Sequence, residues 1–222
     1  MTDTHLDLAD DVPEPRAADG SELLAKGKRT QRRLLEAAEQ VFAELGYHDA
    51  SIVKITEAAG VAQGTFYRYF QSKQAIFDEL VDDLNRRVRW SMSEAAAGAR
   101  TRAETERRGF EAFFRFTAEH PALYRIIRQA EFVSPAALHR HYDRIAAGYV
   151  QGLRKAMDSG EITPADPEVL AWALMGVGEI IGMRWILWGD TSEVPPDVFE
   201  AALGFVVRGL GAAVNGEVQD ER

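Results

Sequence analysis

The sequence predicts an all-α protein of about nine helices. Apolar residues recur at three- and four-residue steps along most of the chain, signals for helix starts and stops are frequent, and the alternating pattern typical of strands is nearly absent. In the first helix, Leu34, Ala38, Val41, Phe42 and Leu45 follow these steps and so share one face. Gly46 is the expected end of that helix.

The later helices are marked by their starts. Side-chain oxygens that can cap a helix, or prolines suited to a first turn, occur at Ser72, at Pro121, at Ser134-Pro135 and at Asp166-Pro167. Gly160 and Gly189 are expected stops. Together these signals predict helices over 26–45, 51–58, 62–69, 73–98, 103–119, 121–130, 135–158, 167–188 and 196–214.

Composition excludes several classes of protein. The 222 residues include no cysteine, which excludes disulfide scaffolds, cysteine nucleophiles and thiolate metal sites and is typical of a cytoplasmic protein. His139 and His141 are two residues apart on a helix and point to opposite sides, so they cannot share a metal. Since no phosphate loop or nucleophile motif is present either, we expect no enzyme, no cofactor and no metal.

The charge is unevenly distributed. The formal net charge is −9, but residues 26–73 carry eight bases and five acids, whereas residues 1–25 carry seven acids and one base. The first 25 residues also lack apolar periodicity, so we expect a disordered acidic tail there. An anionic partner is expected at the basic segment, unless that segment is only a solvated helix face.

One apolar stretch, Val169 to Trp188, is long enough to cross a bilayer. Glu179 and Arg184 interrupt it, and both flanks have the pattern of ordinary helices. We therefore expect a buried helix and no membrane partner.

Residues 51–70 have the pattern of a helix-turn-helix. Gly60 can take the left-handed conformation that ends the first short helix. An apolar inner side is supplied by Ile52, Ile55, Ala59, Val61, Phe66 and Phe70. The residues left to face outward are Gln63, Gly64, Thr65, Tyr67, Arg68 and Tyr69, which can meet base edges and phosphates.

The run from Gly60 to Lys73, GVAQGTFYRYFQSK, strongly resembles the signature of the TetR family of bacterial transcriptional regulators. The resemblance is specific over about residues 28–77. It implies a DNA-binding domain at 26–73, a ligand-binding and dimerisation domain at 74–216, and a homodimer formed through the last two helices, 167–188 and 196–214. The DNA partner would be a double-stranded operator with an inverted repeat.

Carried over by position, the resemblance implies that Gln63, Tyr67 and Gly64 face bases in the major groove. Phosphate contacts are implied for Ser51, Thr65, Tyr69 and Lys73, with non-specific attraction from Lys28, Arg29 and Arg32. Two positions depart from the family pattern: Ala62 replaces a capping serine or threonine, and Lys54 replaces an acid. Tyr67 and Tyr69 could instead pack against the fourth helix.

The last helix has an apolar stripe at four- and three-residue steps, made of Phe199, Leu203, Val206, Leu210 and Ala213. In the preceding helix, Gly178 and Gly182 would admit a neighbouring helix. We expect both features to serve the dimer, with the core of a single subunit as the alternative.

Large apolar side chains are numerous between the two ends of the chain. The expected lining of a small-molecule effector pocket is Phe113, Phe114, Tyr142, Trp172, Met175 and Glu179. Residues 120–132 are similar, less specifically, to family members that respond to acyl-coenzyme A thioesters, for which Arg125 and Arg128 could neutralise phosphates or simply be surface charges.

The sequence thus predicts a ligand-responsive DNA-binding regulator, most often a repressor in this family, released or modulated by an apolar effector such as an acyl-CoA thioester or an aromatic compound. The alternative is a helical protein-interaction adaptor without specific DNA binding.

Overall fold

The computed structural model describes residues 15–189 and 193–212. Its helices are α1 (Ala25–Asp49), α2 (Ile52–Ala58), α3 (Gln63–Phe66), α4 (Lys73–Ala96), α5 (Arg102–Glu119), α6 (Ala122–Val133), α7 (Pro135–Asp158), α8 (Pro167–Gly182) with a π-helical turn η1 (Met183–Leu187), and α9 (Pro196–Gly209). Within these described ranges there is no strand beyond one isolated bridge between Arg16 and Glu22. The predicted all-α fold is confirmed.

Helix boundaries agree with the sequence patterns where a local signal sets them. Asp166 caps α8 by accepting hydrogen bonds from the amides of Glu168 and Val169, as its place before Pro167 predicts. Gly46 breaks the regular helix with φ 75° and ψ 163°, after which one further turn continues to Asp49. The left-handed φ explains why a glycine stands there.

Two predicted helices are shorter than expected. The expected helix 62–69 is regular only from Gln63 to Phe66, because the next amides bond three residues back, from Arg68 to Thr65 and from Tyr69 to Phe66. The expected helix 196–214 ends at Gly209 within the described residues, where Gly211 takes φ +63°. Residues 213 and 214 lie outside the described ranges.

The chain divides into two compact units. The amino-terminal unit contains the described residues up to Arg87 together with Ala122–Tyr142, and the carboxyl-terminal unit contains Val88–Pro121 and the described residues from Asp143 onward. Both α4 and α7 contribute to each unit. The two units are defined by packing contacts and not by function. The predicted division into a DNA-binding domain at 26–73 and a ligand-binding and dimerisation domain at 74–216 therefore stays a prediction.

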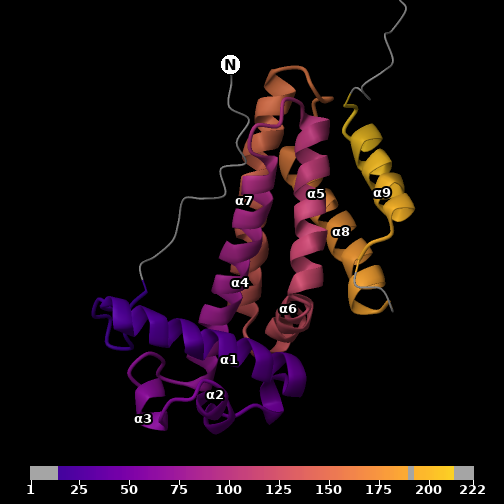
Figure 1. Cartoon of the computed structure of the whole chain (residues 1–222). Coiled ribbons are helices and arrows are strands. Elements are labelled where there is room, and N and C mark those ends of the chain that lie inside the picture. Colours follow the sequence, from indigo (N-terminus) through magenta and orange to yellow (C-terminus); the bar gives the residue numbers. More distant parts are fainter. Residues whose placement is uncertain (1–14, 190–192, 213–222) are drawn as a thin grey trace, which may run out of the picture. The chain divides into compact units, whose positions relative to one another are not determined.

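In the amino-terminal unit, α1 lies against α2 and α6 (Figure 1). The predicted inner face of α1 is buried at Leu34, Ala38 and Phe42, whereas Leu45, beside the break at Gly46, is 40% exposed. Phe42 meets the edge of Phe77 from α4, with ring centroids 5.3 Å apart. Burial of these side chains stabilises the position of α1, against which α2 packs.

In the carboxyl-terminal unit, α5, α8 and α9 pack side by side (Figure 1). Leu203, Val206 and Leu210 are buried within the subunit, so the prediction that this stripe faces a second subunit is wrong. Their side of α9 meets α5, where Phe199 touches the edge of the Phe114 ring. Ala213 lies outside the described residues.

Gly178 also serves the subunit core. A Cβ at this position would lie 3.2 Å from the Phe110 ring of α5, so the absence of a side chain lets that aromatic ring approach α8. Gly182 is buried as well. The predicted role of both glycines at the dimer contact is therefore replaced by packing inside the subunit.

Candidate nucleic-acid interface

The turn between α2 and α3 is held by backbone and side-chain bonds. Gly60 takes φ +61°, and the amide of Val61 donates to the carbonyl of Thr56 at 3.0 Å. From α1, the Arg33 guanidinium donates to the carbonyls of Ala59 (2.5 Å) and Gly60 (3.4 Å). These bonds satisfy the carbonyls of the turn that follows α2 and hold the turn against α1.

Helix α3 separates its inner and outer sides sharply. Phe66 is fully buried and packs against Phe70, with ring centroids 5.7 Å apart. On the other side Gln63 and Gly64 are exposed, and Tyr67 is 53% exposed while touching Phe66 edge-on. The candidate base-reading side chains therefore lie on an accessible surface, as their predicted role requires.

The candidate phosphate contacts of the helix-turn-helix lie around this surface. Thr65 within α3 and Tyr69 just after it are half-buried. Ser51 caps α2 by accepting a hydrogen bond from the amide of Lys54 at 3.2 Å, which leaves its hydroxyl proton able to donate to a phosphate. Ala62 makes no side-chain cap, in agreement with its departure from the family pattern.

Lys73 has a contact that the sequence did not reveal. Its ammonium donates to the carbonyls of Tyr47 (2.7 Å), Ala50 (2.8 Å) and His48 (3.4 Å), and lies 4.3 Å from the centre of the Tyr47 ring. An ammonium has three donors. The structure thus directs them to the last turn of α1 and to Ala50 just after it.

Basic residues of α1 and α2 add positive charge to the unit. Arg29 and Arg32 are exposed and Lys28 is half-buried near the start of α1. Lys54 is exposed on α2 and donates to the carbonyl of Asp49 at 3.1 Å. This arrangement suits attraction of a polyanion, which depends on charge rather than on close geometry.

The segment before α1 differs from the expected disordered tail. From residue 15 the chain forms a turn closed by bonds from Ala17 to Ser21 and from Gly20 to Ala17, both 2.9 Å long. Its Ala18 amide donates to the Arg68 carbonyl at 3.0 Å, just after α3. The Asp19-Gly20-Ser21 run is a local turn signal that could have predicted this turn.

Helix α6 clamps the end of α1. The amide of Tyr47 donates to Gln129 Oε1 at 2.6 Å, and Gln129 Nε2 donates to the carbonyl of Phe42 at 3.4 Å. Arg125, predicted either to neutralise ligand phosphates or to be a surface charge, donates to the carbonyl of Ala43 at 3.3 Å. The polar side of α6 therefore contacts α1, and no local sequence signal predicts this.

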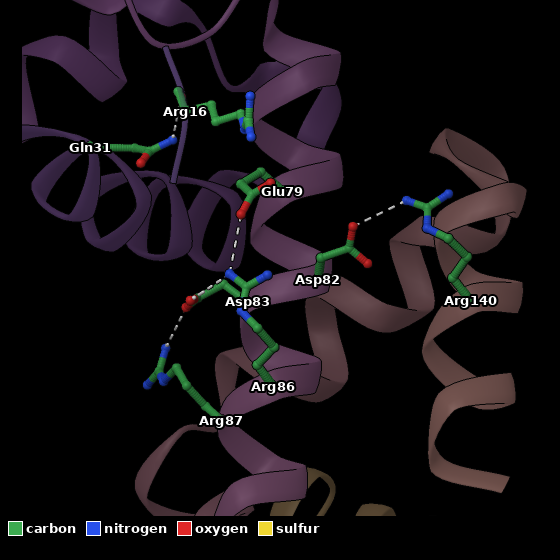
Figure 2. A network of polar contacts seen from close by, with 8 residues as sticks. All are labelled: Arg16, Gln31, Glu79, Asp82, Asp83, Arg86, Arg87 and Arg140. Atoms are coloured by element: carbon green, nitrogen blue, oxygen red, sulfur yellow. Dashed lines mark hydrogen bonds and ion pairs between the residues drawn. The ribbon is translucent and has the colours of Figure 1, made fainter. Parts of the chain in front are cut away.

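Figure 2 shows the ion pairs of α4 in the same unit. Arg86 contacts Glu79 and Asp83, each at 3.1 Å, and Asp82 contacts Arg140 of α7 at 3.4 Å. Burial raises the pKa of the Glu79 carboxyl, and the neighbouring Arg86 opposes that rise. The pair between Asp82 and Arg140 joins α4 to α7.

The neighbouring Arg87 joins α4 to α1. Its guanidinium contacts Glu39 at 2.9 Å, and the same residue lies 3.7 Å from Asp83. The orientation of α1 is thus tied by side chains to both α4 and α6.

The predicted effector residues are divided between the two units, and their role stays a prediction. Phe113 and Phe114 touch, with ring centroids 5.7 Å apart, and belong with Met175 and Glu179 to the carboxyl-terminal unit. Tyr142 belongs to the other unit, and Trp172 is 44% exposed.

Helix α8 with η1, Pro167–Leu187, is long and apolar enough to cross a membrane, although one such helix is weak evidence. The expectation of a buried helix holds only for one side, since Val169 and Ile180 are exposed along with Trp172. Among the described residues there is no cluster of three or more acidic or histidine side chains that could hold a metal.

Comparison with known proteins agrees with this geometry. Residues 34–80 match the model of the family described as bacterial regulatory proteins, tetR family. The HTH-type transcriptional regulator YdgC of Bacillus subtilis, itself uncharacterised, is 33% identical over 182 residues, which cover 78% of this chain and 91% of that protein.

Solved structures share the fold. A TetR-family regulator from Syntrophomonas wolfei is 20% identical, with a TM-score of 0.72 over 86% of this chain and 99% of its own. The regulator FadR of Bacillus subtilis, solved in complex with stearoyl-CoA, is 23% identical, with a TM-score of 0.71 over 80% of this chain and 98% of its own. The similar proteins are DNA-binding transcriptional regulators, not enzymes, and this chain belongs to the tetR family of bacterial regulatory proteins.

Proposed function

We propose that this protein is a cytoplasmic repressor that binds an inverted-repeat operator as a homodimer and releases it when an apolar effector binds. The observation that carries the proposal is the exposed side of α3, where Gln63 and Tyr67 stand on a helix held firmly by the buried Phe66. A recognition helix must combine these two properties, because its side chains can read bases only from a fixed backbone.

The two side chains offer different readouts. The Gln63 amide can donate and accept at once, which suits the adenine edge in the major groove. Tyr67 presents a ring face for a thymine methyl group and a hydroxyl for a phosphate. The neighbouring Gly64 has no heavy atom within 4 Å of an added Cβ, so its lack of a side chain leaves room for a close approach of DNA.

Dimer formation is supported by the outward side of α8 and α9. Val169, Trp172 and Ile180 on α8 are exposed, as is Phe205 on α9. Ala173 and Gly176 are exposed between the α8 residues, which gives four- and three-residue steps along one side. This face, and not the buried stripe of α9, is our proposed contact with a second subunit. Two-fold pairing would present two α3 helices to an inverted repeat.

The DNA-binding proposal is tested on the DNA upstream of the protein's own gene. Gln63→Ala and Tyr67→Ala should each weaken operator binding by about 5- to 140-fold, since a good base contact contributes about 1–3 kcal/mol of discrimination. Gln151→Ala, an exposed glutamine of α7, is the matched control. Retained sequence preference in both α3 variants would contradict the base-contact assignment.

An acyl-CoA thioester is the effector that we favour, with an aromatic compound as the other candidate. The support is the FadR fold, whose solved complex contains stearoyl-CoA, and the aromatic pair Phe113–Phe114. Calorimetric titration with stearoyl-CoA should give heat and should release the operator fragment in a mobility-shift assay. Free CoA is the control for the phosphates, and absence of heat with stearoyl-CoA would remove this effector.

The alternative of a protein-interaction adaptor makes a different prediction in the same assays. An adaptor would show no sequence preference on DNA, and its weak binding would vanish with salt for every fragment alike. Specific binding that depends on Gln63 and Tyr67 would exclude it.

A further inference from the structure

We propose that the turn before α1, residues 15–22, is a positioning element for DNA recognition: it holds the carboxyl-terminal end of α3 and acts on operator binding through that helix. We call these residues the amino-terminal turn. The proposal rests on the DNA-binding function given above and deepens it. Its basis is a chain of hydrogen bonds that runs from α1 through the amino-terminal turn to the segment just after α3.

The recognition helix is too short to hold its own shape. Only Gln63–Phe66 form regular α-helix, and the amides of Arg68 and Tyr69 bond three residues back, at 3.2 and 2.9 Å. A single helical turn is unstable by itself, because nucleating a helix is unfavourable. Carbonyls at the end of a helix also have no partner inside it. Contacts from other parts of the unit must therefore fix the backbone that carries Gln63 and Tyr67.

The amino-terminal turn supplies such a contact at the end of α3. The Ala18 amide donates to the carbonyl of Arg68 at 3.0 Å. In return, Gln71 Nε2 donates to the carbonyl of Ala18 at 3.0 Å. Both backbone groups of Ala18 thus bond to the segment that follows α3. Because Arg68 is the next residue after Tyr67, these bonds also restrict the backbone of Tyr67.

A buried side chain of α1 anchors the same turn. Gln31 is only 7% exposed, and its Nε2 donates to the carbonyl of Arg16 at 3.3 Å (Figure 2). Within the turn, the Ala17 amide donates to the carbonyl of Ser21 and the Gly20 amide donates to the carbonyl of Ala17, both at 2.9 Å. A buried amide that lost its partner would destabilise the fold, so this anchor is maintained by burial.

Helix α1 therefore restrains α3 at both ends. At the amino-terminal end, Arg33 of α1 donates to the carbonyls of the turn between α2 and α3, and at the other end Gln31 acts through the amino-terminal turn. Base readout needs a fixed backbone, whereas general attraction to phosphates depends on charge. Release of one end should therefore weaken specific binding and leave non-specific binding almost unchanged.

The test removes the single backbone donor that reaches Arg68. Ala18→Pro lacks this amide, and it keeps the turn because Ala18 is the second residue of a β-turn closed by the bond from Gly20 to Ala17, a position that favours proline. Ala18→Gly retains the amide and is the matched control. Binding is measured by fluorescence anisotropy on the DNA upstream of the protein's own gene and on a duplex of scrambled sequence.

Ala18→Pro should bind the upstream DNA about 3- to 10-fold more weakly, which is the range that one net hydrogen bond can supply. Its affinity for the scrambled duplex should stay within about twofold of the wild type, because no charge has changed. Ala18→Gly should behave like the wild type on both duplexes. An unchanged ratio of the two affinities in Ala18→Pro would overturn the proposal.

A second variant tests whether the two bonds act together. Gln71→Leu removes the donor to the Ala18 carbonyl from an exposed side chain, so the subunit should stay folded. It should show the same selective loss on the upstream DNA. Since both substitutions release the same contact, the double variant should be within about twofold of Ala18→Pro alone. Losses that multiply would mean that Gln71 acts separately from the turn, against the proposal.

Hydrogen exchange detects the contact in the free protein. The Ala18 amide should be protected in the wild type, and Gln71→Leu should reduce that protection. Exchange of this amide at the rate of an unbonded peptide in the wild type would show that the turn does not hold Arg68, and would overturn the proposal.

The outcomes separate this proposal from the proposed function. If the wild type prefers its upstream DNA and Gln63→Ala removes that preference while Ala18→Pro retains it, only the role of the amino-terminal turn fails. If the wild type itself has no preference for the upstream DNA, the proposed function fails as well.

Discussion

Lys73 provides a prediction that separates a structural role from a DNA contact. The family resemblance implies a phosphate contact, whereas the structure places the ammonium on the carbonyls of the last turn of α1 and of Ala50. Lys73→Met keeps the aliphatic stem and removes the charge. It would leave the Tyr47 and Ala50 carbonyls, now bonded at 2.7 and 2.8 Å, without their partner.

The expected cost follows from these contacts. Hydrogen bonds to a charged group contribute about 1.5–3 kcal/mol each, and the contact with the Tyr47 ring adds about 0.5–1 kcal/mol. Lys73 is only half-buried, so in the variant water can bond to the exposed carbonyls and offset part of the lost free energy. We expect a loss of about 2 kcal/mol, which for a chain of this length lowers the melting temperature by about 4–8 °C.

The assay combines thermal unfolding with the salt dependence of DNA binding. Lys54→Met is the matched control, because the exposed Lys54 makes one bond, to the carbonyl of Asp49 at 3.1 Å. It should change the melting temperature little. If Lys73→Met unfolds at the wild-type temperature and instead lowers the salt slope by about 0.9 for each phosphate that is no longer neutralised, the role of Lys73 in holding the end of α1 is refuted.

Three further substitutions test the remaining contacts. Phe205→Glu should convert the proposed dimer to monomers without unfolding the subunit, since Phe205 is 64% exposed; a sedimentation profile like that of the wild type would argue against the outward face of α9 as the contact. Gln129→Ala should cost about 1–3 kcal/mol by orphaning the Tyr47 amide, whereas Gln129→Glu keeps an acceptor and should cost less; equal melting curves would show that the clamp contributes little. Glu79→Gln should remove part of the pH dependence of the free energy of unfolding. Because the pKa of this carboxyl is raised in the folded state, its contribution to stability is present at acid pH and is lost as the pH rises through the folded-state pKa. The stability of the wild type relative to the variant should therefore increase as the pH falls from 7 to 4, and a constant difference would refute this sign.

Local patterns predicted the helices and the reading surface well. The three- and four-residue steps identified the buried face of α1, and Gly46 and Gly60 both take the positive φ that their positions suggested. Asp166 caps α8 as its place before a proline indicates. Each of these features depends on residues within one or two turns of each other, which is the range over which backbone sterics and hydrogen bonding act.

Predictions that needed a distant partner were less successful. The apolar stripe of α9 looks the same whether it meets α5 of its own subunit or another subunit, and only the packing of the three helices shows that Leu203 and Val206 turn inward. Likewise, nothing near Gln129 in the sequence indicates that its amide meets α1, 82 residues earlier.

The sequence by itself determined that this chain is helical, that residues 51–70 form a helix-turn-helix, and which side chains of α3 face outward, because helical periodicity and glycine conformation are local properties. Tertiary structure alone decided which face of α9 remains open, that Lys73 holds the end of α1, and that the turn before α1 is bonded to Arg68 just after α3. Those outcomes depend on which surfaces meet after the helices have formed, and many helix arrangements are compatible with one pattern of apolar residues.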